Sequence, residues 1–525
     1  MLRPIHSLLS CQVALLVLAM APALATAAPA DRWPMYRANP ARTAHVESSL
    51  DTNLAARWVY RAEHAPQPAW PRSPRMPFDR AQHVVIADGK VFFGSTVDCQ
   101  VRALDLESGK QAWSLTTAGP IRFAPAIWKD RLLAVSDDGF LYALSLDQGQ
   151  LLWKKRGGPD DSTILGNNRL ISKWPVRGGP VVIDDVAYFA AGIWPTDGIY
   201  LHALNPQDGE PIWVNSESGS RYMAQPHGGA NAKSGASAQG YLVVSGNHLL
   251  VPTGRAVPAA FDREKGELAF FHLQKFGHNG GTPTMAIGDM FFNSGIGFSS
   301  ESGDKLSTVG TGQLAATSDG LVRAAGGVVT GYKFVEAEKP DRKGNLVKVQ
   351  VLEPSWVVKN VHTDASLMVA GQHVISGSAG HVDIIDLAEH KVIQSLPIDG
   401  TAYGLAVASG RLLVSTDTGS IHCFAADNGE PLATVGNKPP ATPADSDSEL
   451  RQYAQQVLKR ADIRAGFCVD FGCGDGALAE ALADQTNLQI IAIDDDPENV
   501  QRARQRLIAR GLYGSRVIVL LRSLE

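Results

Sequence analysis

Three glycines near the end of the chain have the spacing of a loop that holds a nucleotide-type cofactor. Gly472, Gly474 and Gly476 follow an apolar run, and Asp470 stands just before them. Glycine lacks a Cβ, so its backbone can lie directly against a ligand. A further acid, Asp494, ends the next apolar run. The glycines therefore predict a loop that holds a nucleotide-type cofactor.

The residues around these glycines predict alternating strands and helices. Two apolar runs are each followed by a helical segment, and residues 515–525 begin a third strand. This β-α-β-α-β order is typical of a parallel, doubly wound sheet that binds its ligand beyond the carboxyl ends of the strands. Apolar residues at helical spacing in residues 448–463 predict one more helix in front of the first strand.

The run D-x-G-x-G-x-G at residues 470–476 resembles the first motif of class I S-adenosylmethionine-dependent methyltransferases. In the dinucleotide fingerprint G-x-G-x-x-G the third glycine comes one place later. The resemblance implies a Rossmann-like α/β domain in which the glycine loop lies against the methionine end of S-adenosylmethionine. It also implies that Asp494, with its neighbour Asp495, binds the ribose. A Rossmann half for another nucleotide, or a degenerate fold that binds nothing, is the alternative.

The same resemblance implies a seven-stranded sheet, whereas residues 450–525 supply three strands. A half sheet buries little apolar surface and has an open edge. We therefore expect residues 450–525 to be an incomplete methyltransferase domain, either a fragment of a longer protein or a remnant. We expect weak cofactor binding by this half-domain, assign no catalytic residue, and leave open whether the chain is an enzyme.

An eleven-residue pattern recurs through most of the remaining chain. "ALDLESGKQAW" ends at Trp113, "ALSLDQGQLLW" at Trp153 and "ALNPQDGEPIW" at Trp213, and three weaker copies follow. Asp and Gly at fixed positions predict a tight turn. A period near 40 residues with short alternating strands predicts four-stranded β-propeller blades. We expect the three Trp rings to dock between neighbouring blades.

These copies resemble the tryptophan-docking motif of pyrroloquinoline-quinone (PQQ)-like propellers. That family includes quinoprotein alcohol dehydrogenases and the propeller of the outer-membrane assembly machinery. The resemblance covers residues 31–436 and implies a mainly β fold with eight blades, or alternatively seven. Residues 31–44 resemble the usual opening of such domains, and we expect them to supply the strand that closes the last blade against the first.

The features that quinone-dependent oxidation requires do not accompany the repeats. The dehydrogenases of the family place two adjacent cysteines against PQQ and hold calcium with carboxylate and amide side chains. None of the 5 cysteines adjoins another, and no calcium-binding pattern is present in the sequence. PQQ and a PQQ-dependent oxidoreductase are therefore disfavoured. Cys468 and Cys473 lack the further ligands of a zinc site, so no metal is predicted.

Residues 1–28 have the pattern of a secretory signal peptide. A basic start precedes an apolar run that is too short to span a bilayer, and small residues follow at cleavage spacing. The net charge of −5 provides no basic field for nucleic acid. We expect an exported protein of the periplasm or cell envelope, soluble and without a transmembrane segment after cleavage.

Residues 437–449 are rich in Pro, Ala, Ser and Asp and predict a linker between the two parts. The leading hypothesis is an exported propeller that binds an unidentified protein or small molecule on one face and is joined to an S-adenosylmethionine-dependent methyltransferase domain. The alternative is a non-enzymatic propeller scaffold. Long polar loops at residues 157–180 and 218–242 are candidate walls of a ligand site.

Overall fold

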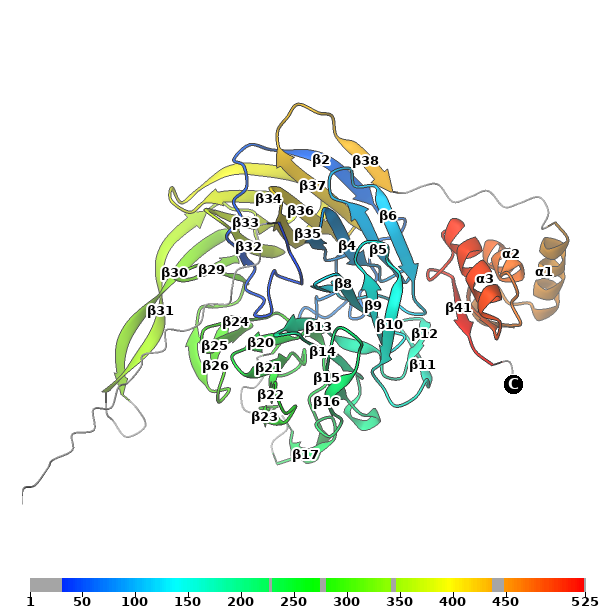
Figure 1. Ribbon diagram of the computed structural model, residues 1–525, viewed down its shortest axis with the longest axis horizontal. Helices are drawn as coiled ribbons and strands as arrows, with labels where there is room; N and C mark the ends of the chain where they lie inside the picture. Colours follow the sequence, from blue (N-terminus) through cyan, green and yellow to red (C-terminus); the bar gives the residue numbers. More distant parts are fainter. Residues whose placement is uncertain (1–30, 226–228, 274–279, 341–345, 437–447, 524–525) are drawn as a thin grey trace, which may run out of the picture.

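The computed structural model describes residues 31–225, 229–273, 280–340, 346–436 and 448–523 (Figure 1). The predicted signal peptide at residues 1–28 and nearly all of the predicted linker at residues 437–449 lie outside the described residues. The described chain has a ring of β-sheets and, beside it, a small α/β part. Within the described ranges, no helix combines the length and the apolar character needed to cross a membrane.

Short antiparallel sheets make up the ring, as the repeats predict. Five sheets of four strands are formed by the described residues, and each follows the order of the chain. Their strands are β3 (Val85–Ala87), β4 (Lys90–Gly94), β5 (Gln100–Asp105), β6 (Gln111–Thr116); β7 (Ala126–Trp128), β8 (Arg131–Val135), β9 (Phe140–Ser145), β10 (Leu151–Arg156); β20 (Val243–Ser245), β21 (His248–Val251), β22 (Ala259–Asp262), β23 (Leu268–Phe270); β24 (Thr284–Ile287), β25 (Met290–Asn293), β26 (Ile296–Ser299), β27 (Lys305–Thr308); β28 (Gln313–Ala316), β29 (Gly320–Ala325), β30 (Val328–Pro340) and β31 (Leu346–Lys359).

Two larger sheets complete the ring. The first contains β13 (Val176–Ile183), β14 (Val186–Ala191), β15 (Tyr200–Leu204), β16 (Pro211–Asn215) and a short parallel strand β19 (Gly240–Tyr241). The second has nine strands: β1 (His45–Val46), β32 (Ser366–Ala370), β33 (His373–Gly377), β34 (Ala379–Asp386), β35 (Lys391–Ala408), β36 (Arg411–Thr416), β37 (Ser420–Ala426), β2 (Leu54–Arg61) and β38 (Ala433–Gly436).

The two long loops of the propeller each contain a short β-hairpin. The hairpin of β11 (Thr163–Gly166) and β12 (Arg169–Ser172) lies in residues 157–180, and the hairpin of β17 (Arg221–Ala224) and β18 (Asn231–Ser234) lies in residues 218–242. A 3-10 helix, η1 (Pro195–Asp197), precedes β15.

The strand that closes the ring is β2, which pairs antiparallel with β37. The prediction that residues 31–44 supply this strand was therefore wrong. Those residues run along the inner strands instead, with one or two backbone hydrogen bonds to each of several sheets. The hydrogen bonds are Trp33 N to Ile86 O, Ile127 N to Pro34 O, Val244 N to Pro40 O, Ala286 N to Ala41 O, Ala316 N to Thr43 O and Val369 N to Ala44 O, all 2.7–2.9 Å.

Arg42 joins this central segment to β13 and to the residue between β19 and β20. The side chain is fully buried, and it donates to the carbonyls of Leu242 (2.9 Å), Tyr36 (3.0 Å) and Pro180 (2.8 Å). Burial lowers the pKa of Arg42 to about 10, which still leaves the guanidinium charged at neutral pH. A buried charge is tolerated when its donors are satisfied. The segment therefore acts as a hub for the inner strands, because one cation satisfies three carbonyls there.

Four tryptophans contact the turn of the sheet that follows them in the ring. The indole N–H groups of Trp58, Trp113, Trp153 and Trp213 donate to the carbonyls of Leu106 (3.0 Å), Leu146 (3.3 Å), Gln207 (3.2 Å) and Arg263 (2.8 Å). Each ring also lies on the glycine of that turn, so that a Cβ added at Gly109, Gly149, Gly209 or Gly266 would approach the ring to less than 3.0 Å. Trp58, on the closing strand, stands outside the eleven-residue repeat and was not predicted.

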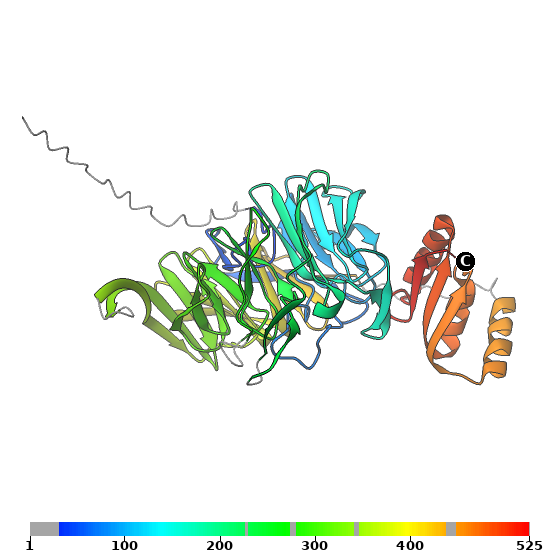
Figure 2. The ribbon, with the colours of Figure 1, turned by 90° about the horizontal axis from the view of Figure 1, so that it is seen from below.

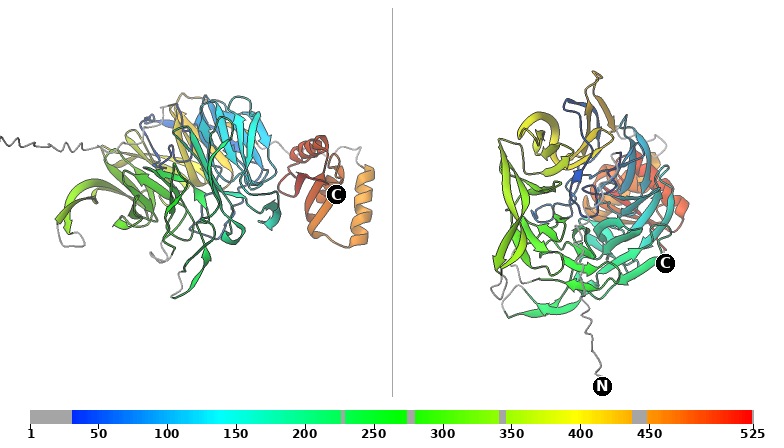
Figure 3. Two further views of the ribbon diagram at one scale, coloured as in Figure 1. Left: turned by 60° about the horizontal axis from the view of Figure 1, so that its bottom comes forward. Right: turned by 60° about the vertical axis from the view of Figure 1, so that its left-hand side comes forward.

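The C-terminal part has the predicted order of elements (Figures 2 and 3). It contains α1 (Ser448–Ala461), β39 (Ala465–Phe471), α2 (Ala477–Gln485), β40 (Asn487–Asp494), α3 (Pro497–Ala509) and β41 (Val517–Leu521). The three strands form a parallel sheet in the order β39-β40-β41. Buried side chains of α2 and α3 pack on one face, among them Ala479, Leu482 and Leu507.

We predict that Gly149→Ala destabilises the propeller more than Gly89→Ala. Both glycines have a left-handed φ, +68° and +69°, so both substitutions carry a backbone strain of ~1–2 kcal/mol. Only the Cβ at Gly149 meets the Trp113 ring, whereas that at Gly89 meets nothing within 4 Å. Overpacking should add ~1–3 kcal/mol at Gly149. Urea unfolding of the two variants measures the difference, and equal losses would contradict the proposed contact.

Candidate cofactor site

The glycine loop follows β39 and begins α2. Gly472, Gly474 and Gly476 all have a left-handed backbone, with φ of 71°, 57° and 79°. The N–H of Gly472 donates to Ile493 O on the next strand (2.8 Å), which fixes the start of the loop. A Cβ at Gly476 would lie 3.0 Å from the Cβ of Ala503 on α3, whereas a Cβ at Gly474 would meet nothing within 4 Å. Gly476 therefore permits helix packing, and Gly474 presents bare backbone to open space.

Asp494, at the carboxyl end of β40, lies beside this loop. Its side chain is buried (3% exposed) and accepts hydrogen bonds from Gly474 N (2.9 Å), Asp496 N (3.0 Å) and Asn499 Nδ2 (3.0 Å). Burial raises the pKa of Asp494, but these hydrogen bonds outweigh it and hold the pKa below its usual value. Asp494 is therefore a carboxylate that fixes the glycine loop to the second strand.

Asp470 is the second acid of the loop, and one of its oxygens has no partner. Its Oδ2 is buried and makes no hydrogen bond within the described residues. Burial, and then the nearby charge of Asp494, raise the pKa of Asp470. An unpaired buried acceptor beside a carboxylate favours a cationic hydrogen-bond donor at this place. The ammonium group of S-adenosylmethionine is such a donor, so the residues present fit this cofactor.

The other acids of this region have different surroundings. Asp495 is exposed. Asp496 is the N-cap of α3, and its Oδ1 accepts from Glu498 N (2.8 Å). Asn499 and Asp496, which orient Asp494, were missed in the sequence. The Asp-Pro start of α3 is the signal that could have indicated the cap.

An ion network under the loop joins α2 to α3. Arg506 donates to Glu480 and Asp475 (both 3.0 Å), and Arg510 donates to Glu480 (2.9 Å) and Asp484 (3.0 Å). Glu480 lies on α2 and is nearly buried. Because the two arginines share this carboxylate, the network holds the two helices that frame the glycine loop at a fixed spacing.

Residues just before and after β41 contact the propeller. The buried hydroxyl of Tyr513 donates to Thr117 O (2.9 Å), and Arg522 Nη2 donates to Asp161 O (2.8 Å). His64 Nε2 lies 3.0 Å from Gly511 O. Figures 2 and 3 show the α/β part beside the cyan strands of the ring. The α/β part and the propeller are therefore in direct contact at the two ends of β41.

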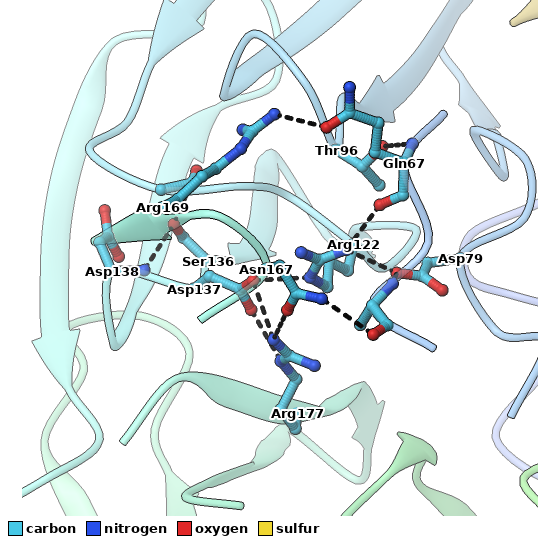
Figure 4. Close-up of polar contacts among 12 residues, drawn as sticks. Gln67, Asp79, Thr96, Arg122, Ser136, Asp137, Asp138, Asn167, Arg169 and Arg177 are labelled. Carbon is cyan, nitrogen blue, oxygen red and sulfur yellow. Dashed lines mark hydrogen bonds and ion pairs between the residues drawn. The ribbon is translucent and has the colours of Figure 1, made fainter. Parts of the chain in front are cut away.

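A buried ion cluster holds the propeller loops on this side (Figure 4). Arg122 pairs with Asp79 (2.7 Å) and Asp137 (2.6 Å), and Arg177 pairs with Asp137 (2.8 Å). Burial raises the pKa of Asp137, but the two arginines outweigh it and hold the pKa below its usual value. These pairs tie the loop that contains Asp79 to the start of β13.

The 157–180 loop is attached to the same cluster. Arg169 on β12 donates to Val97 O (2.7 Å). It also donates to Gln67 Oε1 (3.0 Å), as Figure 4 shows. Asn167 donates to Ala69 O (2.9 Å). The β11–β12 hairpin is thus held against two neighbouring loops. In the 218–242 loop, residues 226–228 lie outside the described residues, and Arg221 is exposed.

Comparison with known proteins matches each of the two parts of the chain to a family model. Residues 58–268 match a family model described as outer membrane protein assembly factor BamB, and residues 468–524 match a methyltransferase domain model. A search of curated proteins returned no match.

Solved quinoprotein structures are similar in fold. A europium-containing methanol dehydrogenase is 11% identical, with a TM-score of 0.52 over 76% of this chain and 98% of its own. The quinohemoprotein alcohol dehydrogenase from Comamonas testosteroni is 13% identical, with a TM-score of 0.52 over 82% and 86%. The quinohemoprotein alcohol dehydrogenase ADHIIG from Pseudomonas putida HK5 is 12% identical, with a TM-score of 0.54 over 91% and 95%. At these identities the likeness is one of fold.

The predicted resemblance is confirmed: the chain is a PQQ-like β-propeller of the type found in BamB and the quinoprotein alcohol dehydrogenases, followed by a C-terminal methyltransferase domain segment.

Proposed function

We propose that this chain is an exported propeller that serves as a binding scaffold and carries a class I site for S-adenosylmethionine. The observation that carries the cofactor proposal is the bond between the Gly474 N–H and the Asp494 carboxylate, beside the unpaired Asp470 oxygen. Export is inferred from the pattern of residues 1–28. The scaffold role is inferred from the propeller, which recurs with many unrelated functions.

The chain's own residues would hold the cofactor by its two ends. The bare backbone at Gly474 leaves room for the methionine part, and Asp470 would accept from its ammonium group. Asp494 would accept from the ribose hydroxyls, for which its hydrogen bonds from Asp496 and Asn499 pre-orient the carboxylate. The cofactor, when bound, supplies a methyl group activated by a sulfonium.

The affinity for S-adenosylmethionine should be low, because β39 lies at an open edge of the sheet. This strand pairs only with β40 in the described residues, and its side chains Phe467, Val469 and Phe471 are 49%, 47% and 68% exposed. Ligand sites usually bury most of the ligand between several elements. A site with one open side buries less of the ligand surface and therefore binds it more weakly. We expect a dissociation constant of ~100 µM or weaker, about 5.5 kcal/mol of binding free energy.

For the propeller we propose eight blades. Six would be the separate sheets, and two would come from the nine-stranded sheet, in which β35 is 18 residues long. That length allows β35 to be the outer strand of one blade and the inner strand of the next. Closure of β37 by β2 then completes the last blade.

A binding role on one face suits this propeller better than quinone chemistry. The central segment, residues 31–44, hydrogen-bonds to the inner strands around the ring. Beside it, a cavity lined by Tyr36, His83 and Tyr403 measures about 30 Å³, against ~300–1,000 Å³ for typical ligand pockets. The sequence also has no adjacent cysteines. We therefore propose that partners bind at the loops of a face, as protein or small molecule.

Asp494→Ala should weaken S-adenosylmethionine binding by ~10-fold or more. The substitution removes the ribose acceptor and releases the Gly474 N–H, at a cost of ~1–3 kcal/mol. Equilibrium dialysis with labelled cofactor measures the change on the full chain. Glu498→Gln is the matched control, because this exposed acid lies in the first turn of α3, and its side chain is not assigned to the site. Equal affinities for Asp494→Ala and wild type would contradict the proposal, as would the absence of any saturable binding.

Asp470→Asn should weaken cofactor binding and raise stability at neutral pH. Because the folded-state pKa of Asp470 is raised above 3.8, its ionisation opposes folding, so stability is lost as the pH rises through the folded pKa. Asparagine avoids that loss. The gain should be under ~1 kcal/mol, since the group is partly exposed, and should vanish below the ordinary pKa. Urea unfolding between pH 3 and 8 measures it. A loss of stability at neutral pH would contradict this reading of Asp470.

A further inference from the structure

The second face of the methyltransferase sheet, opposite α2 and α3, is unevenly covered. Ile491 on β40 and Ile518 and Leu520 on β41 point to this face and are at most 8% exposed. On β39 the residues of the same face are Phe467, Val469 and Phe471, which are about half exposed or more. The register confirms the shared face, because Val469 pairs with Ile491 and Ile491 pairs with Ile518. Coverage therefore decreases from β41 to β39.

The cover comes from the propeller. Ala118, in the loop after β6, and Leu170, on β12, pack against Ile491, Ile518 and Leu520. Parallel sheets occur almost only with both faces covered, usually by helices. Here helices cover one face of the sheet. On the other face, propeller side chains cover the part next to β40 and β41, where a second layer of helices would usually lie.

The turn before β41 is shaped for this contact. Tyr513 is 1% exposed and belongs to the same apolar cluster as Cys99 of the propeller. Its hydroxyl donates to Thr117 O. At Gly514 an added Cβ would overlap Val97 O, and at Gly511 it would overlap the carboxylate of Glu63. At Gly514 the two backbones therefore approach too closely for any residue with a Cβ.

The contact reaches the cofactor site through one residue. The backbone N–H of Arg522 donates to Asp494 O (3.0 Å), and its guanidinium donates to Asp161 O on the propeller (2.8 Å). Asp494 is the proposed ribose acceptor. The propeller loop 157–180 is therefore two hydrogen bonds away from the residue that the cofactor site depends on.

We propose that the propeller is the second layer of the methyltransferase sheet. The docking platform is Val97–Cys99, Thr117, Ala118, Asp161 and Leu170, and its partner is the β40–β41 half of the sheet in the same chain. The buried Arg169 side chain donates to Val97 O and so fixes the β11–β12 hairpin to the rest of the platform. Docking keeps the carboxyl ends of β40 and β41 in place, so cofactor affinity depends on the propeller. This last step rests on the proposed function, whereas docking itself does not.

Leu170→Asp and Leu165→Asp in the full chain test the docking. Both leucines lie in the β11–β12 hairpin and are paired across it, but Leu170 contacts the sheet and Leu165 is 60% exposed. Hydrogen exchange followed by mass spectrometry reports on β40 and β41. We expect Leu170→Asp to speed exchange there by ~10-fold or more, and Leu165→Asp to leave it unchanged. Unchanged exchange in β3–β6 shows that the propeller remains folded.

Three outcomes decide the proposal. Faster exchange in β40 and β41 for Leu170→Asp alone supports docking, and equal exchange in all three proteins overturns it. Should Leu170→Asp unfold the propeller, Tyr513→Phe replaces it, because this change keeps the ring and removes the hydroxyl that donates to Thr117 O. Faster exchange of β41 then supports docking, and unchanged exchange overturns it.

The dependence of the cofactor site on docking is measured separately by equilibrium dialysis. We expect ~3–10-fold weaker S-adenosylmethionine binding for Leu170→Asp than for Leu165→Asp. Equal affinities overturn the link to the cofactor site. A wild-type chain that binds no cofactor would overturn the proposed function and the link together, while the exchange result would still decide whether the propeller is the second layer.

Discussion

Sheet faces and edges must be covered, and the rest of this structure depends on how that is done. In the ring, the indoles of Trp58, Trp113 and their equivalents lie on the turn glycines of the next sheet. Pairing of β2 with β37 then closes the ring, so that its sheets keep only short edges. In the C-terminal part, helices cover one face of the sheet, and propeller side chains cover half of the other.

Buried arginines are stabilised in two different ways in this chain. Arg42 is surrounded by backbone carbonyls and joins the central segment to the inner strands. Arg122 and Arg177 pair with buried carboxylates and hold the long loops on the side of the methyltransferase segment. Breaking a buried pair leaves an uncompensated charge, which is strongly destabilising. Both arrangements therefore favour one position of the loops over others.

Asp494, which fixes the glycine loop, also takes part in the contacts that connect this loop to the propeller. Asp494 orients Gly474, and the strand end that carries Asp494 is bonded to Arg522. Arg522 in turn reaches the propeller at Asp161. These contacts link the propeller to the glycine loop through Arg522 and Asp494.

The sequence alone determined the kinds of elements and the chemistry of the loop. Turn residues and Trp recur at a fixed period, and the spacing of Gly472, Gly474 and Gly476 is local, so both can be read from neighbouring residues. Tertiary structure alone decided that residues 31–44 form a hub and that β2 closes the ring. It also decided that Leu170 covers a distant sheet. These outcomes depend on contacts between residues hundreds of positions apart, and a local pattern does not specify such pairs.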